Sequence, residues 1–160
     1  MPRQSAGIVL FRRRDDRVEV LLAHPGGPVW RNRDEGAWSI PKGEPDDGED
    51  GDLLAVALRE FEEETGHRLQ ADENGLPIPL GQIRQKGGKV VHAWAIEGDL
   101  DPAEARSNVF RMEWPPRSGQ IRSFPEIDRV EWFDAGAARQ RVKDTQIPLL
   151  ERLLEHLERP

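Results

Sequence analysis

The stretch Arg59-Glu60-Phe61-Glu62-Glu63-Glu64-Thr65-Gly66, which follows Pro41-Lys42-Gly43, decides the fold and contains the main chemical signal of the sequence. Glu60, Glu63 and Glu64 are three and four residues apart, so in a helix their carboxylates project from one face within one turn. Like charges at this spacing destabilise a helix by roughly a few tenths of a kcal/mol per pair. A bound hard cation explains such a face, because Mg²⁺ binds carboxylate oxygens together with substrate phosphates and water.

These residues resemble the Nudix hydrolases, whose pattern is G-x5-E-x7-R-E-U-x-E-E-x-G-U, where U is a bulky apolar residue. The fixed letters correspond to Gly43, Glu49, Arg59, Glu60, Phe61, Glu63, Glu64 and Gly66. A run of glutamates is otherwise usually a solvated helix face. The Pro-Lys-Gly before this run, the arginine at its start and the glycine at its end favour the functional interpretation.

The sequence departs from the family pattern in two places. Residues 50–58 separate Glu49 from Arg59 by nine positions where the family has seven, and His67 stands where an apolar residue is expected. The surplus falls in Glu49-Asp50-Gly51-Asp52, which predicts an irregular loop with Asp50 or Asp52 as the helix N-cap. A two-residue bulge there keeps the later ligands in register, and whether Glu49 reaches the metal stays open. Gly66 is expected to end the helix as a left-handed C-cap.

The composition indicates one globular domain, residues 1–160. The chain has a net charge of −7, which disfavours nonspecific nucleic-acid binding because phosphate-backbone affinity needs clustered Lys and Arg. It has no cysteine, so disulfides and thiolate chemistry are excluded. No apolar run approaches the roughly 18 residues of a membrane span, and no signal-peptide core follows Met1. We therefore expect a cytoplasmic protein without a membrane partner, either a monomer or a homodimer.

Apolar periodicity predicts mostly strands. The expected elements are a hairpin of residues 6–11 and 18–23, a short strand at 38–40, the glutamate-rich helix, a hairpin of 80–85 and 89–96, a strand at 129–133 and a terminal helix at 148–157. Residues 98–120 are expected to be irregular, as a functional or disordered loop. The fold class is α/β, and the resemblance implies the Nudix fold, a mixed β-sheet sandwiched between α-helices.

The resemblance also implies roles for residues in and beyond the motif. The expected metal ligands for Mg²⁺, with Mn²⁺ as an alternative, are Glu60, Glu63, Glu64 and Glu126, of which Glu60, Glu63 and Glu126 are the expected catalytic residues. Glu126 is included because several Nudix enzymes place a further glutamate just before a late strand. One of these glutamates acts as general base, with Glu63 or Glu126 preferred. Gly43, Arg59 and Gly66 are expected to support the site, with Arg59 orienting Glu63.

Substrate contacts are expected from residues around the motif. Lys42 is a candidate phosphate contact, and so is Arg117 in the Pro-rich segment before Gly119. Four aromatic residues that border loops are candidates for stacking on a base: Trp30, Trp94, Trp114 and Phe124. Trp38 and Trp132 lie in strand-like runs and are expected in the core.

The predicted function is Mg²⁺-dependent hydrolysis of a pyrophosphate bond in a nucleoside diphosphate linked to another group. Within the Nudix hydrolases, the segments Trp38–Gly43 and Gly48–Asp50 are most similar to the diadenosine polyphosphate hydrolase branch. The alternatives are hydrolysis of damaged nucleoside triphosphates or nucleotide sugars, and a non-catalytic nucleotide-binding Nudix module. An EF-hand is excluded for residues 46–57, because the third and twelfth positions are Gly48 and Ala57 where acidic ligands are required.

Overall fold

The computed structural model describes residues 3–49, 51–69 and 75–158. Its elements in chain order are β1 (Gln4–Arg14), β2 (Arg17–Pro25), β3 (Lys42–Gly43), α1 (Leu53–Thr65), β4 (Ile78–Arg84), β5 (Val90–Glu97), η1 (Pro102–Glu104), β6 (Val109–Glu113), β7 (Ile121–Pro125), β8 (Ile127–Asp134), α2 (Ala135–Arg141), η2 (Asp144–Gln146) and α3 (Ile147–Glu158). None of the helices in the described ranges is long and apolar enough to cross a membrane.

The central sheet is mixed. Its strands lie in the order β4-β5-β1-β2-β8, and β3 pairs with β1 beside this row. β1 and β5 are parallel, whereas the other pairs in this sheet are antiparallel. Asp15 and Asp16 make the tight turn between β1 and β2 with φ of 51° and 64°, values that Asp and Asn tolerate better than other side chains. The predicted N-terminal hairpin is confirmed.

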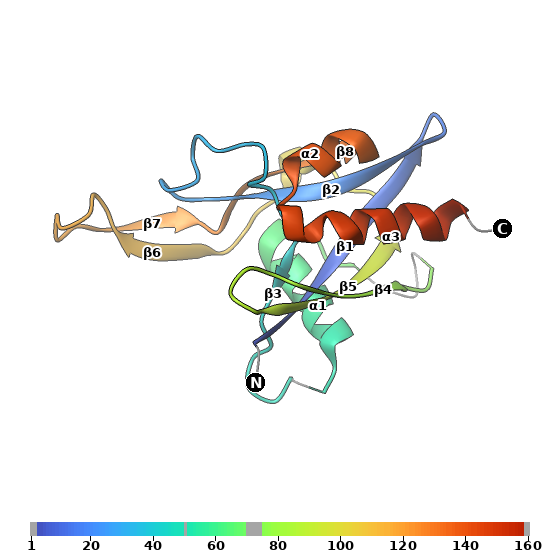
Figure 1. Ribbon diagram of the computed structural model, residues 1–160. Helices are drawn as coiled ribbons and strands as arrows, with labels where there is room; N and C mark the ends of the chain where they lie inside the picture. The colour runs from blue at the N-terminus through green and yellow to red at the C-terminus, as the bar shows by residue number, and fades with distance from the viewer. Residues whose placement is uncertain (1–2, 50, 70–74, 159–160) are drawn as a thin grey trace.

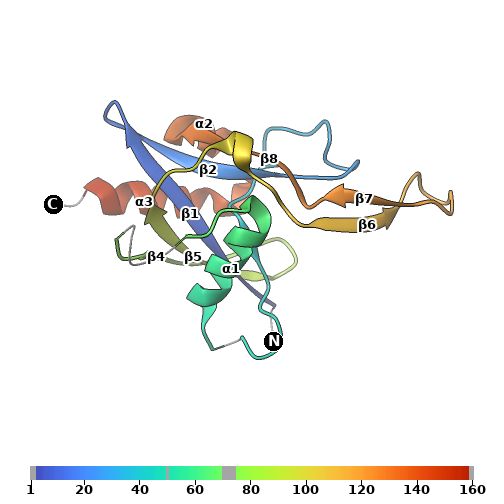
Figure 2. The ribbon, with the colours of Figure 1, turned by 180° about the vertical axis from the view of Figure 1, so that it is seen from behind.

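Helices cover both faces of this sheet, with α2 and α3 on one face in Figure 1 and α1 on the other in Figure 2. Successive residues of a strand point to opposite faces. Ile8 and Leu10 of β1 therefore pack in the core under α1, and Val9 and Phe11 pack in the core under α3. The predicted mixed sheet sandwiched between helices is confirmed.

Local sequence signals set the two ends of α1. The Asp52 carboxylate accepts a hydrogen bond from the backbone N–H of Ala55 at 3.1 Å, so Asp52 is the N-cap. Asp50, the other predicted cap, lies outside the described residues. Gly66 ends the helix in the left-handed conformation with φ of 75°. Phe61 is fully buried against the sheet, and Glu60 and Glu64, which flank it around the helix, lie beside β3.

The expectation of an irregular segment from 98 to 120 is wrong for part of it. β6 and β7 form a separate antiparallel sheet, in which Val109 pairs with Pro125 and Glu113 with Ile121. Both views show this β6–β7 arm extending away from the main sheet (Figures 1 and 2). Its strands are largely exposed and lack a clean alternation of apolar and polar residues, so periodicity did not reveal them.

Candidate active site

The predicted carboxylates gather where α1 crosses β3. The backbone N–H of Lys42 in β3 lies 3.3 Å from Oε1 of Glu64. Gly43, the next residue, lies directly against the carboxylate of Glu60, and a methyl group at this position would overlap that carboxylate. The side chain of Glu60 is only 13% exposed. The close approach of α1 to β3 therefore requires glycine at position 43 and places Glu60 and Glu64 at one end of the sheet.

Burial in this cluster makes the carboxylates costly to ionise. Burial, together with the charge of Glu60, raises the pKa of Glu64 to about 8, although Lys42 opposes this effect. Burial and the charge of Glu63 also raise the pKa of Glu60. The charge of Glu126 contributes in the same direction to both groups. Glu60, Glu64 and Glu126 therefore lie near enough to repel one another, although they are far apart in sequence.

Arg59 organises the side of the cluster that faces the loop before α1. Its Nη1 donates to Glu60 at 3.0 Å and to Glu63 at 3.1 Å. Its Nε and Nη2 donate to the two oxygens of Glu49 at 3.0 and 2.8 Å, in a bidentate pair. Nη2 also reaches the backbone oxygen of Glu44 at 3.2 Å. One guanidinium thus fixes the orientation of Glu60 and Glu63 relative to the loop.

The two surplus residues before α1 do not remove Glu49 from this network. Glu49 also accepts the backbone N–H of Asp46 at 2.7 Å, and its own N–H donates to the Asp46 oxygen at 3.0 Å. The bond from Arg59 and that from Asp46 lower the pKa of Glu49, so this carboxylate stays ionised. The loop between Gly43 and Asp52 absorbs the surplus and presents Glu49 to Arg59.

Glu126 lies between β7 and β8, where backbone bonds hold it from two sides. Its N–H donates to Asn108 and its carbonyl accepts from Gly26, each at 2.8 Å. It also lines a pocket of about 410 Å³ between the base of the β6–β7 arm and the loop after β2. The other lining residues are Pro25, Gly26, Gly27, Pro28, Val29, Trp30, Phe110 and Met112. This size and apolar lining are typical of a small-molecule site.

The carboxylates can supply only part of the coordination shell of Mg²⁺ or Mn²⁺. No group of three or more His, Cys, Asp or Glu side chains within the described parts of the chain is arranged as a ready-made metal cage. Mg²⁺ is usually bound by one or two carboxylates together with substrate phosphates and water. Glu60 and Glu64, with Glu126 nearby, provide such a set, and their mutual repulsion is what a cation relieves. The residues therefore fit the ion.

Lysines also lie near Glu64. Burial and the charges of Lys143 and Lys89 lower the pKa of Lys42 to about 8, against the opposing effect of Glu64. Burial and Lys89 likewise lower the pKa of Lys143, on which Glu64 also acts. Sequence reasoning found Lys42 but missed Lys89 and Lys143. The available signal was the rarity of lysine, because the chain has only four.

The structure does not bring Arg117 to the carboxylates. Arg117 lies in the turn at the tip of the β6–β7 arm, with φ of 62°, and its N–H donates to Glu113 at 2.9 Å. Both views place this tip away from α1 (Figures 1 and 2). Its phosphate contact stays a prediction without support from this arrangement.

Among the aromatic candidates, Trp30 lines the pocket beside Glu126, whereas Phe124 packs on Phe110 within the arm at 6.0 Å. Trp94 packs against the core under α1, and Trp114 lies beyond β6 in the arm. Trp38 is buried as expected. Trp132, which was expected in the core, is only partly buried at the edge of the core, where the guanidinium of Arg12 covers its ring at 4.1 Å.

Family comparison agrees with this geometry. The model of the NUDIX domain matches residues 1–153, so the chain belongs to this family. Members of this family are generally hydrolases, and the predicted family and fold are confirmed.

Solved structures share the fold at low sequence identity. The chain is similar to an Ap4A hydrolase of C. elegans in a binary complex, with 21% identity, 97% of each chain covered and a TM-score of 0.61. It is also similar to the NUDIX domain of Shewanella oneidensis NrtR complexed with ADP ribose, with 19% identity, 98% and 89% covered and a TM-score of 0.66. NrtR complexed with a 27mer DNA matches with 20% identity, 96% of this chain and 61% of that chain covered, and a TM-score of 0.58.

Proposed function

We propose that this protein is a divalent-metal-dependent hydrolase that cleaves a pyrophosphate bond in a nucleoside diphosphate linked to another group. The observation that carries the proposal is the convergence of Glu60, Glu64 and Glu126 beside an apolar pocket that Glu126 itself lines. Acidic groups crowded in a half-buried site are unfavourable without a cation, and perturbed pKa values of this kind cluster at functional sites. The family to which the chain belongs gives the reaction type.

Glu60 and Glu64, with Glu126, would hold Mg²⁺ or Mn²⁺. Such an ion, when bound, neutralises phosphate charge and makes water more acidic. Arg59 holds one oxygen of Glu63 and leaves the other able to accept a proton from the attacking water. Glu126, on the wall of the pocket, is the second candidate for this general base. The role of these residues is chiefly positioning and electrostatics, because phosphoryl transfer needs little covalent chemistry from the protein.

The pocket beside Glu126 supports a nucleotide as the substrate. Trp30 and Phe110 offer aromatic surfaces, and Gly26 and Gly27 allow close approach of the backbone. A Cβ at Gly27 would lie 2.8 Å from the Phe110 ring, so a side chain at this position would alter the pocket wall. We propose that the nucleoside lies here and that its phosphates extend toward Glu60 and Glu64. Ap4A is the first substrate to test, since a similar structure is that of an Ap4A hydrolase.

A regulatory or purely binding role is the second candidate, because NrtR proteins share the fold and one is complexed with DNA. The carboxylate cluster of the present chain favours catalysis over binding alone. Its net charge of −7 argues against DNA as a partner, since DNA affinity depends on clustered cations. We therefore propose a nucleotide partner and no nucleic acid.

A product-resolved screen tests the proposal. Ap4A, ADP-ribose, nucleotide sugars and oxidised nucleoside triphosphates are incubated with the protein and Mg²⁺ or Mn²⁺, and products are separated by chromatography. We expect at least one of them to be cleaved between phosphates and cleavage to stop in excess EDTA. Full turnover in EDTA would refute the metal role. Binding of these compounds without turnover in either metal would favour the non-catalytic alternative.

A further inference from the structure

All four lysines of the chain meet in one place. Lys42 belongs to β3, Lys86 and Lys89 lie in and after the turn between β4 and β5, and Lys143 follows α2. The chain also has nineteen arginines, which are spread over most of its length. Lysine is a compact point charge and a common phosphate ligand. The convergence of every lysine from three separate segments therefore marks this place for an anion.

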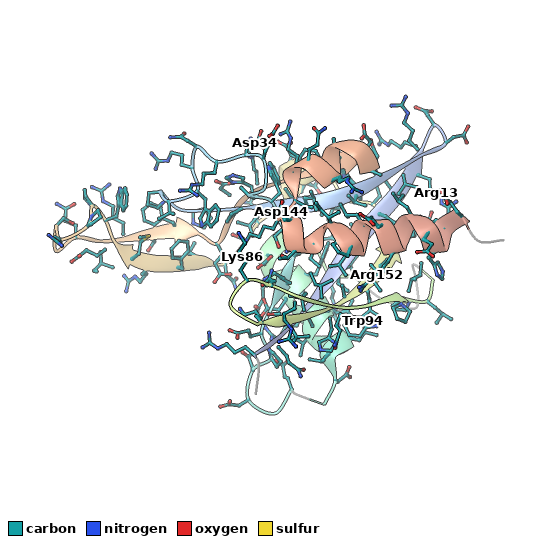
Figure 3. The ribbon with its side chains drawn as sticks, viewed as in Figure 1. Arg13, Asp34, Lys86, Trp94, Asp144 and Arg152 are labelled. Atoms are coloured by element: carbon teal, nitrogen blue, oxygen red, sulfur yellow. The ribbon has the colours of Figure 1, made fainter. Side chains whose placement is uncertain are left out.

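A second pocket lies among these segments. It has a volume of about 520 Å³, and Lys86, Lys143, Gln85, Thr145 and Trp30 are among its lining residues. Asp144 and Glu35, both exposed, also line it, while Lys143 is half-buried. Lys86 and Asp144 lie on the same side of the molecule in Figure 3. The acidic side chains of this pocket are thus exposed, whereas its cation Lys143 is partly shielded from water.

The buried lysines have little compensation from carboxylates. No salt bridge within the described residues involves Lys42 or Lys143, and Lys89 has only a contact of 3.9 Å with Glu44. Nζ of Lys143 lies 5.4 Å from the centre of the Trp30 ring. Burial lowers the pKa of Lys143, and the charge of Lys89 adds to this effect. A bound polyanion would reverse this cost, as a cation does for the carboxylates.

The lysines and the carboxylates form one continuous site. The backbone N–H of Lys42 donates to Glu64 at 3.3 Å, and the charge of Glu64 acts on both Lys42 and Lys143, so these lysines begin where the carboxylate cluster ends. Trp30 lines both the 520 Å³ pocket and the apolar pocket beside Glu126. A ligand with its nucleoside in the apolar pocket and its reacting phosphates at Glu64 would direct any further phosphates toward Lys143.

We propose that Lys42, Lys89 and Lys143 bind the phosphates beyond the cleaved bond, and that the pocket lined by Lys86 and Lys143 accepts the end of a chain of three or more phosphates. This inference rests on the proposed function, which sets the order of nucleoside, cleaved bond and further phosphates along the site. It makes phosphate number, rather than the nucleoside alone, the property that the site selects. Lys143 is the specificity-determining residue, because it connects the carboxylate end to the pocket.

Direct binding of inorganic tripolyphosphate tests the lysine site without any turnover. Isothermal titration in EDTA compares the wild type with Lys143→Gln, Lys143→Arg and the charge-matched control Arg13→Gln. Arg13 is exposed and lies well away from Lys86 in Figure 3. We expect Lys143→Gln to weaken tripolyphosphate binding at least fivefold, Lys143→Arg to restore part of it, and Arg13→Gln to change it less than twofold. Equal affinities for the two glutamine variants would overturn the proposal, as would no binding to the wild type.

Turnover assays distinguish a failure of this inference from a failure of the proposed function. Lys143→Gln should raise KM for Ap4A, with four phosphates, at least fivefold more than it raises KM for ADP-ribose, with two. Equal effects on both substrates, in an active enzyme, would remove the phosphate-counting role and leave hydrolysis intact. Tripolyphosphate binding that depends on Lys143 in a protein without hydrolase activity would support the anion site and refute catalysis. Thermal unfolding of each variant confirms that it is folded.

Discussion

Replacement of Glu64 by Gln is expected to stabilise the metal-free protein. Burial and Glu60 raise the pKa of Glu64 from 4.5 to about 8 in the folded state. Between these two values the folded protein holds a proton that the unfolded chain has released. Because the folded state binds more protons, stability falls as the pH rises from about 4.5 to about 8 and then levels off. Gln carries no charge at any of these pH values, so the stability of the variant does not fall in this way as the pH rises.

The magnitude follows from the same pKa values. Each pKa unit corresponds to about 1.36 kcal/mol, so the full difference has an upper bound of about 5 kcal/mol above pH 8 and about 3 kcal/mol at pH 7. Movement of the carboxylate toward water reduces this figure. We expect a gain of at least roughly 1 kcal/mol at pH 9, which corresponds to a rise in Tm of about 2–4 °C for a domain of this size. Near pH 5 the two proteins should differ little.

The assay is thermal unfolding in EDTA at pH 5, 7 and 9, with Glu62→Gln as the matched control. Glu62 lies on the same helix but is exposed, so its replacement should change the free energy of unfolding by less than about 0.5 kcal/mol. Adding Mg²⁺ should then raise the Tm of the wild type more than that of Glu64→Gln, because a ligand stabilises only the state that binds it. A Glu64→Gln variant that is no more stable than the wild type at pH 9 would refute the argument.

Three further changes test the geometry of the site. Gly43→Ala places a methyl group on the carboxylate of Glu60, so kcat should fall at least about tenfold while the fold survives, as circular dichroism would show. Glu49→Gln weakens the bidentate bond from Arg59 and should lower kcat by about tenfold, less than the roughly 10²-fold loss that removal of a metal ligand causes. Glu126→Gln should lower kcat with little change in KM, as expected of a group that acts chiefly in the transition state.

These variants have simple controls and clear contrary results. A methyl group at Gly51 would have no neighbour within 4 Å, so Gly51→Ala should keep full activity. Full activity of Gly43→Ala would show that Glu60 can move without a fall in kcat. A loss for Glu49→Gln as large as for Glu64→Gln would place Glu49 among the metal ligands. Unchanged kinetics for Glu126→Gln would remove this residue from the reaction.

Signals that act over a few residues allowed most of the fold to be predicted. The N-cap Asp52, the C-cap Gly66 and the buried Phe61 specify α1 locally, since each acts within one or two turns of the helix. The hairpin turn at Asp15 and Asp16 is equally local. The family resemblance then implied a mixed sheet between helices, whereas the order of the strands was not predicted.

Interactions between distant segments were harder to predict from the sequence. Nothing near Lys143 in the sequence indicates that it lies beside Lys42, because the two are joined only by the packing of the segment after α2 against the end of the sheet. The bidentate pair of Arg59 with Glu49 depends on the path of the loop between them, and loop paths are poorly specified by composition. The β6–β7 arm was missed because its strands bury little and so have no hydrophobic period.

Arginine and lysine have different roles in this site. A guanidinium forms bidentate pairs that neutralise carboxylates permanently, as Arg59 does with Glu49. An arginine at position 42 or 143 would have this option with Glu64 and would compete with a metal ion for it. Lysine at both positions keeps positive charge near Glu64 without a bidentate pair, so the carboxylate remains available to a cation and the ammonium groups to phosphate. Under the proposed function, the same region would bind a metal and a polyanion together, as hydrolysis of a phosphate chain requires.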